Sequence, residues 1–157
     1  MHFMTPVKDI HRLEANDDHD KSLGVLFDPQ SVAIIGASDD TSRIGGRSIL
    51  YLKNYGFSGS IYPVNLNRAH IQGLPAYSSV ELIPGEVSLA ILALPANAVL
   101  EAVRACARKG VKVVIIFSAG FAESHEDGAA QQAELVEVAR AAGVRLLGPN
   151  CLGAFNL

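Results

Sequence analysis

The stretch SVAIIGASDDTSRIGG, residues 31–46, decides the fold. Its first five residues are typical of a short strand, and the strand pattern ends at Gly36. A glycine-rich loop follows and opens a helix that turns Ile49 and Leu52 inward and stops near Gly56. A strand, a glycine-rich loop and a helix in this order favour a phosphate-binding loop over a turn that only connects the two elements, because glycines let backbone N–H groups approach an anion.

Four further strand patterns follow the first one along the chain. Two of them are almost continuously apolar, as strands are when helices cover both faces of a parallel sheet. The four patterns lie at residues 60–64, 87–94, 111–117 and 144–147.

Helical spacing fills the gaps between these strands. It spans residues 99–106 and 135–142, with stops at Gly110 and Gly143, and a short helical turn is expected at 78–83. The alternation predicts an α/β fold with a Rossmann-like doubly wound parallel sheet of about five strands. Right-handed crossovers then favour the strand order 3-2-1-4-5.

The overall composition is that of one soluble globular domain, and its two cysteines lead us to expect a cytoplasmic protein. A net charge of −3 without a Lys/Arg cluster argues against nucleic-acid binding, and no apolar run could span a membrane. Residues 1–22 are polar and aperiodic, so we expect a flexible arm before a single domain at 23–157. Cys106 and Cys151 lack metal-ligand spacing, and we interpret them as reduced thiols.

The expected ligand site lies at the carboxyl edge of the sheet, where the strand order reverses. With the order 3-2-1-4-5, the loops at 36–46 and 118–121 should lie side by side there. Thr41 and Ser42 supply hydroxyl donors in the first loop, and Arg43 supplies a cation.

The loop differs from a dinucleotide fingerprint. Its later glycines come only at Gly45 and Gly46, and the end of the second strand reads VNLNR, residues 64–68, with no acid for the ribose hydroxyls of NAD. Coenzyme A carries a 3′-phosphate on its ribose, for which Arg68 is a reasonable partner. An ordinary solvated surface cation is an equally good interpretation of Arg68.

Six segments occur in order and at the spacing of a known family. The chain resembles the CoA-binding domain of the NDP-forming acyl-CoA synthetases, a group that includes ADP-forming acetate–CoA ligase and the α subunit of succinyl-CoA synthetase. The similarity runs from about residue 23 to the end. The segments are residues 26–38, 45–46, 61–65, 94–96, 117–123 and 146–153.

The resemblance implies coenzyme A as the cofactor and assigns contacts by motif position. These are the pyrophosphate loop, the adenosine end, the wall of the cleft, the pantetheine arm and a loop near the phosphohistidine site. In that order the residues are Gly36, Ala37, Ser38, Thr41, Ser42, Arg43 and Ile44, then Asn65 and Arg68, then Pro95, then Ser118 and Ala119, then Asn150.

The resemblance also implies the chemistry of the parent protein, an acid–thiol ligase. An acid, ATP and CoA become acyl-CoA, ADP and phosphate through an acyl phosphate and a phosphorylated histidine. The implied partners are later domains or a subunit that carry this histidine and an ATP-grasp site, and homo-oligomerisation is left open. We expect the 157-residue chain to bind CoA and to catalyse nothing by itself.

Other functions remain open at this stage. The chain could be a regulatory CoA-binding domain of a protein lysine acetyltransferase, or a stand-alone CoA-binding protein. An NAD(H)-binding domain of a transcriptional repressor is disfavoured by the missing acid.

Three further residues invite a catalytic interpretation that we do not favour. We expect His125 to be a solvated loop residue and Glu123 to cap the following helix. Cys151 has no general base at recognisable spacing, so we expect it to pack behind its loop.

Overall fold

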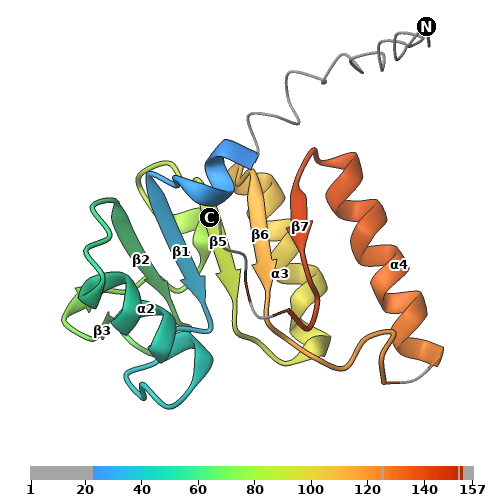
Figure 1. Cartoon of the computed structure of the whole chain (residues 1–157), viewed down its shortest axis with the longest axis horizontal. Helices are drawn as coiled ribbons and strands as arrows, with labels where there is room; N and C mark the ends of the chain where they lie inside the picture. Colours follow the sequence, from blue (N-terminus) through green and yellow to red (C-terminus); the bar gives the residue numbers. More distant parts are fainter. Residues whose placement is uncertain (1–22, 125, 152, 154–157) are drawn as a thin grey trace, which may run out of the picture.

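The computed structural model describes residues 23–124, 126–151 and 153. The predicted arm at 1–22 and His125 therefore lie outside the described residues (Figure 1). The described chain begins with a helical segment at residues 23–27 and continues directly into the first strand of a central sheet. No helix among the described residues combines the length and apolar composition needed to cross a membrane.

Five parallel strands form the central sheet, which confirms the predicted Rossmann-like α/β class (Figure 1). Each strand is short and rich in β-branched or other apolar residues. In spatial order they are β2 (Ser60–Val64), β1 (Ser31–Ile35), β5 (Leu89–Leu92), β6 (Val113–Ile116) and β7 (Arg145–Leu147). β1, β5 and β6 are buried along their whole length, β7 is half-buried, and β2 is buried only at its carboxyl end.

The predicted strand order 3-2-1-4-5 is wrong. The third strand of the sheet, β5, lies beside β1 on the side away from β2, so the observed order is 2-1-3-4-5. Ile35 of β1 pairs with Val64 of β2 on one side and with Leu92 of β5 on the other. β1 is therefore an interior strand, and β2 is an edge strand.

The connection between β2 and β5 explains the difference. It contains no α-helix but a small antiparallel hairpin, β3 (His70–Ile71) and β4 (Leu74–Pro75), and a 3₁₀ helix, η1 (Val80–Leu82). After the hairpin, Tyr77 donates its N–H to Pro63 O and accepts from Asn65 N–H. These bonds occupy the outer edge of β2, where the third strand was expected, and the chain then crosses to the far side of β1.

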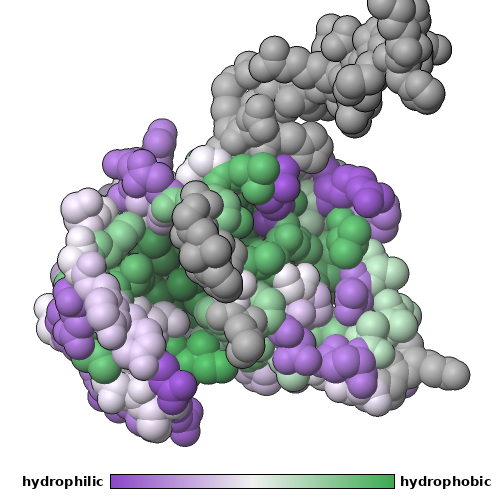
Figure 2. Space-filling view, in the orientation of Figure 1, coloured by the Kyte–Doolittle hydropathy of each residue, from purple (hydrophilic) through white to green (hydrophobic). Residues whose placement is uncertain are grey.

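Helices cover the two faces of the sheet unequally. α2 (Ile44–Asn54) covers one face, whereas α3 (Ala96–Lys109) and α4 (Glu126–Ala141) cover the other (Figure 1). α3 and α4 end next to Gly110 and two residues before Gly143, as the sequence predicted. Patches of hydrophobic surface lie beside α2 on this side of the molecule (Figure 2).

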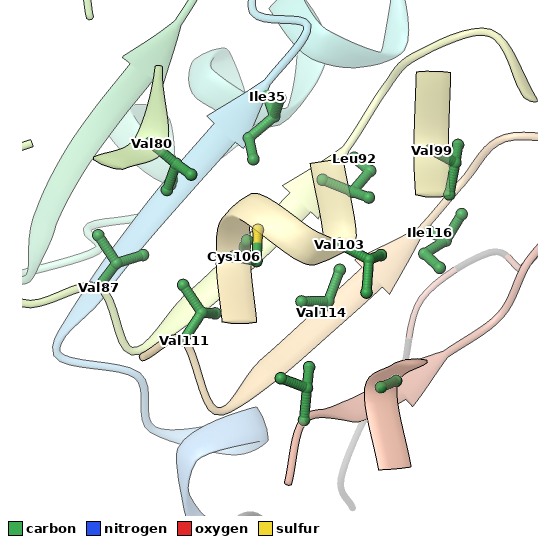
Figure 3. Close-up of a cluster of buried hydrophobic side chains, with 14 of the residues drawn as sticks. Ile35, Val80, Val87, Leu92, Val99, Val103, Cys106, Val111, Val114 and Ile116 are labelled. Atoms are coloured by element: carbon green, nitrogen blue, oxygen red, sulfur yellow. The ribbon is translucent and has the colours of Figure 1, made fainter. Parts of the chain in front are cut away.

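Alternation along each strand divides the core into two clusters. On β1, Ala33 and Ile35 face α3 and α4, and Val32 and Ile34 face α2. On the α3 side, Val99, Val103 and Cys106 recur at helical spacing and pack on strand residues such as Leu92, Val114 and Ile116 (Figure 3). This packing holds the carboxyl ends of β1, β5 and β6 in register at one edge of the sheet.

Candidate functional site

A cavity of about 560 Å³ opens at this carboxyl edge. Residues from the loops that follow β1, β2, β5 and β6 line it, together with the first residues of α2. The lining consists of Gly36, Ala37, Ser38, Ser42, Arg43, Ile44, Gly45, Asn65, Ala93, Leu94, Phe117 and Ser118.

The corrected strand order changes which loops are neighbours. The chain leaves β1 toward β2 and leaves β5 toward β6, so the strand order reverses between β1 and β5. The prediction that the loops after the first and fourth strands lie side by side was therefore wrong, because the loop after β5 lies between them. The loop after β6 still reaches the cavity, and Ser118 donates its hydroxyl to Leu94 O at 2.5 Å.

The start of the loop after β1 contacts both strands that neighbour β1. Gly36 and Ala37 both donate their N–H groups to Val64 O at 3.1 Å. Gly36 has φ +89, and a Cβ atom there would lie 2.3 Å from Ala93 O, so only glycine fits between β1 and β5. The backbone at this turn is thus fixed before any ligand binds.

α2 begins directly against this loop. A Cβ atom on Gly45 would lie 2.1 Å from Gly36 O, and one on Gly46 would lie 2.1 Å from Asp40 O. The sequence suggested that the glycines make room for a phosphate, whereas these two make room for the loop's own carbonyl groups. They bring the first turn of the helix onto the floor of the cavity.

The N-terminus of α2 faces the cavity with free donors. Arg43 is its N-cap residue and makes no side-chain cap hydrogen bond. Arg43 O accepts from Gly46 N–H and Arg47 N–H, but the structure gives the N–H groups of Ile44 and Gly45 no acceptor. Ile44 and Gly45 line the cavity, so two unsatisfied donors and the positive end of the helix dipole are available to an anion.

Asp40 organises the side chains of the loop. It accepts hydrogen bonds from Ser42 Oγ at 2.6 Å and from Ser42 N–H at 2.9 Å, and Arg43 Nε lies 3.5 Å from its other oxygen. The hydrogen bond from the Ser42 hydroxyl, followed by that from the Ser42 N–H, lowers the pKa of Asp40 below its usual value. Asp40 is therefore ionised at neutral pH, and a phosphate would have to compete with it for Ser42 and Arg43.

Eight of the thirteen residues predicted to bind the cofactor line the cavity. They come from the loop after β1, the start of α2, the end of β2 and the loop after β6. They are Gly36, Ala37, Ser38, Ser42, Arg43, Ile44, Asn65 and Ser118.

The other five predicted residues lie around the cavity but not in its wall. Thr41 is exposed within the loop, and Arg68 is exposed and lies 3.6 Å from Asp39. Pro95 is the N-cap residue of α3, Ala119 is exposed beside Ser118, and Asn150 donates its N–H to Ser118 O at 2.9 Å.

Sequence reasoning missed four residues of the wall. Ala93 and Leu94 follow β5 and enter the wall because β5, not the second strand, neighbours β1. Phe117 is the last residue of the apolar run that forms β6, and Gly45 was noted only as part of a motif. The correct strand order was the signal that would have identified Ala93 and Leu94.

The side chains that invited a catalytic interpretation make structural contacts. Cys151 Sγ lies 3.5 Å from Ile116 O and 3.6 Å from Leu147 O, and packs against the core cluster on the α2 side, as expected. Glu123 accepts a hydrogen bond from Gly120 N–H within its own loop. Burial raises the pKa of Cys106 to about 12, so its thiol stays protonated. Among the described residues, no three His, Cys, Asp or Glu side chains are grouped to hold a metal ion.

Comparison with known proteins supports a single family. Residues 30–156 match the sequence model of a family described as "CoA binding domain". The chain is 45% identical over 134 residues to the α subunit of ADP-forming acetate–CoA ligase II of Pyrococcus furiosus, covering 85% of this chain and 29% of the relative. It is 44% identical over 131 residues to a trans-feruloyl-CoA synthase of an unknown prokaryote, covering 83% of this chain and 18% of the relative.

A solved structure agrees with these sequence matches. The chain is similar to acetyl-coenzyme A synthetase 1 of Candidatus Korarchaeum cryptofilum, solved with phosphate and ADP, with a TM-score of 0.80 and 37% identity. The similarity covers 83% of this chain and 28% of that one. The chain thus spans less than a third of the length of each of these relatives.

Proposed function

The chain belongs to the family of CoA-binding domains, and from this we propose that the cavity at the carboxyl edge of its sheet is the coenzyme A site. The observation that carries the proposal is the start of α2. The free N–H groups of Ile44 and Gly45 open into a cavity that lies within the matched residues 30–156. Two donors and a helix dipole suit an anionic group such as the pyrophosphate.

The pyrophosphate would lie between the loop after β1 and the first turn of α2. Backbone donors there are fixed, and Ser38, Ser42 and Arg43 line the same wall. The Arg43 side chain is exposed and pairs with Asp40, so it can turn toward a phosphate without disturbing the core. Thr41 stays at the rim as a further hydroxyl donor.

The adenosine end would lie toward β2. Asn65 lines the cavity there, and Arg68 follows three residues later beside Asp39. Since no carboxylate follows β2 to bind a ribose diol, the exposed Arg68 favours a 3′-phosphorylated ribose over that of NAD. Arg68 would exchange part of its pairing with Asp39 for the phosphate.

The pantetheine arm would run toward β5 and β6. Leu94 and Phe117 supply apolar surface for its alkyl groups, and Ser118 lies next to them. Pro95, Ala119 and Asn150 lie just beyond this end, where the thiol would leave the domain. The thiol would therefore point away from the domain, toward whatever part of the protein carries out the reaction.

We propose that the parent protein is an ADP-forming acyl-CoA synthetase of the cytoplasm. The relatives reported above are an acetate–CoA ligase, a feruloyl-CoA synthase and an acetyl-CoA synthetase, which favours a ligase over an acetyltransferase. Their names specify acids of very different size, yet this region is conserved between each of them and the chain at 37–45% identity. Acid selectivity and the phosphohistidine and nucleotide sites would thus belong to other domains or a partner subunit.

The experiment that tests the CoA site is calorimetric titration of the chain with CoA, 3′-dephospho-CoA and NAD. We expect CoA to bind most tightly and 3′-dephospho-CoA more weakly. Binding of NAD without binding of CoA would overturn the proposal. In a coupled assay with ATP, acetate and CoA, we expect no turnover by the chain alone. Turnover would contradict the proposal that the catalytic sites belong to other domains or a partner subunit.

A further inference from the structure

Gln72 joins two parts of the loop after β1 without lining the cavity. It lies in the turn between β3 and β4. The β3 strand lies beside α2 (Figure 1). The side-chain amide of Gln72 donates to Ser38 O at 3.0 Å and to Gly46 O at 2.8 Å. These acceptors lie 34 and 26 residues away in sequence, at the two ends of the segment that carries the free N–H groups.

One NH₂ group makes both contacts. A side-chain amide has two N–H donors, and each of them bonds to one end of the segment 38–46. The amide therefore closes this segment into a ring, fixing the distance between its start and the first turn of α2. Ser38 at one end lines the cavity, and Gly46 at the other directly follows the donors Ile44 and Gly45.

The backbone at Gln72 adds to this link. Its N–H donates to Asp39 Oδ1 at 2.8 Å, and its carbonyl accepts from Lys53 Nζ at 2.9 Å. The preceding residue, Ile71, is 1% exposed in the core cluster under α2. The turn is thus anchored to the core, to α2 and to the loop at once, so it can hold the loop in place.

The backbone conformation of Gln72 points to the importance of its side chain. Its φ is +48, and Gly73 follows with φ +80, as in the two-residue hairpin turns in which Asn-Gly is preferred. Glutamine is not a residue that favours this left-handed region. Asparagine would suit the turn better but has a side chain one methylene shorter than the one that reaches both carbonyls.

We propose that Gln72 is a positioning residue of the coenzyme site, which orients the pyrophosphate-binding N–H groups of Ile44 and Gly45 by cross-linking Ser38 and Gly46. The inference rests on the proposed function, since the ligand of those N–H groups is taken to be CoA. Without the cross-link, ligand binding must order the loop, and affinity falls by the free energy of that ordering.

Three substitutions distinguish the role of the Gln72 side-chain amide from that of the backbone turn. Gln72→Glu keeps the shape but places a carboxylate against two carbonyl oxygens, and Gln72→Gly removes the side chain while favouring the positive φ. Gln72→Asn keeps an amide that is too short for both contacts. Gln131→Glu adds the same charge on an exposed part of α4 and serves as the matched control.

We expect each Gln72 variant to weaken CoA binding about tenfold, as loss of two hydrogen bonds to the loop implies. Gln131→Glu should stay within about twofold of the original chain. The affinities for CoA and for 3′-dephospho-CoA should fall by the same factor, because the cross-link acts on the pyrophosphate loop and not on the 3′-phosphate. Hydrogen exchange in the ligand-free chain should accelerate at amides 38–47 and remain unchanged in α3.

The outcomes distinguish this inference from the proposed function. Tight CoA binding by Gln72→Gly or Gln72→Asn, at the level of the original chain, overturns the inference. Acceleration of exchange across the whole sheet would also overturn it, because Gln72 would then act on the fold at large. If the original chain does not bind CoA, the proposed function fails, and the exchange measurement still decides whether Gln72 holds the loop.

Discussion

The side-chain amide of Asn65 donates a hydrogen bond of 2.9 Å to the carbonyl oxygen of Ala37. This bond ties the end of β2 to the loop after β1, and Asn65 Oδ1 also accepts from Asn67 N–H at 2.9 Å. One side chain therefore organises both the wall of the cavity and the turn that leads to Arg68. Gln72 makes a second link to the same segment, at Ser38 and Gly46.

Replacing Asn65 with leucine should loosen this corner of the cavity. Leucine has a similar shape but no hydrogen-bonding groups, so Ala37 O and Asn67 N–H lose their partner. We expect a loss of about 1–2 kcal/mol in the free energy of unfolding and weaker CoA binding, measured by urea denaturation and calorimetry. Asn67→Ala removes only an exposed side chain and should change neither quantity. Unchanged CoA affinity in Asn65→Leu would contradict the assignment.

Gly45 offers a test of how closely α2 rests on the loop. In an unobstructed helix, alanine would be more stable than glycine by about 0.5–1 kcal/mol. At Gly45 the added Cβ would lie 2.1 Å from Gly36 O, so we expect Gly45→Ala to lower the free energy of unfolding by about 2 kcal/mol or more. Gly24 lies in the helical segment at 23–27 with no atom within 4 Å of its Cβ position.

Gly24→Ala is therefore the matched control. It should leave the stability unchanged or raise it slightly. Chemical denaturation of the two variants and the original chain measures both effects. Equal stability of Gly45→Ala and Gly24→Ala would show that α2 begins further from the loop than the structure indicates.

Local patterns along the chain predicted most of the fold. The strands at 31–35 and 60–64, the two long helices and their ends follow from periodicity and from Gly110 and Gly143. Apolar content identified the interior strands because residues buried on both faces leave no polar position. What the pattern could not show was the edge to which β5 is added.

That edge depends on contacts between residues far apart in the sequence. Tyr77 occupies the outer side of β2 through two backbone hydrogen bonds, and no feature of residues 65–78 distinguishes a hairpin that does so from an ordinary connection. Gln72 was missed for the same reason, since its partners lie 26 and 34 residues away. The eight predicted residues that line the cavity were identifiable from the sequence because they lie in the loops that follow β1, β2 and β6 or at the start of α2.

The buried thiol of Cys106 should make the protein less stable at alkaline pH. Burial raises the pKa of this thiol from 9.0 to about 12. The unfolded chain therefore loses this proton at lower pH than the native chain. The contribution of this thiol to native stability is constant below about pH 9 and falls as pH rises from 9 toward 12. The slope contributed by this one group approaches about 1.4 kcal/mol per pH unit.

Cys106→Ala removes the titrating thiol from both states. Urea unfolding of the variant and the original chain between pH 7 and pH 11, about the range in which the thiol of the unfolded chain ionises, should give curves that converge as pH rises. The variant is less stable at neutral pH because it leaves a small cavity. Parallel curves over the whole range would show that the thiol is accessible to water in the native state.

A substitution of Arg68 tests whether this residue binds the 3′-phosphate of CoA or is a solvated surface cation. Its guanidinium lies 3.6 Å from Asp39 and is exposed, so it is available to a 3′-phosphate at the mouth of the cavity. If it binds that phosphate, Arg68→Gln should weaken the binding of CoA about three- to tenfold, as expected for one charge-assisted contact near solvent. The affinity for 3′-dephospho-CoA should be unchanged, so the preference for CoA disappears. Lys112→Gln removes an exposed cation before β6, at the opposite edge of the sheet, and should leave that preference intact. A preference that persists in Arg68→Gln would show that Arg68 is a solvated surface cation and that another group recognises the phosphate.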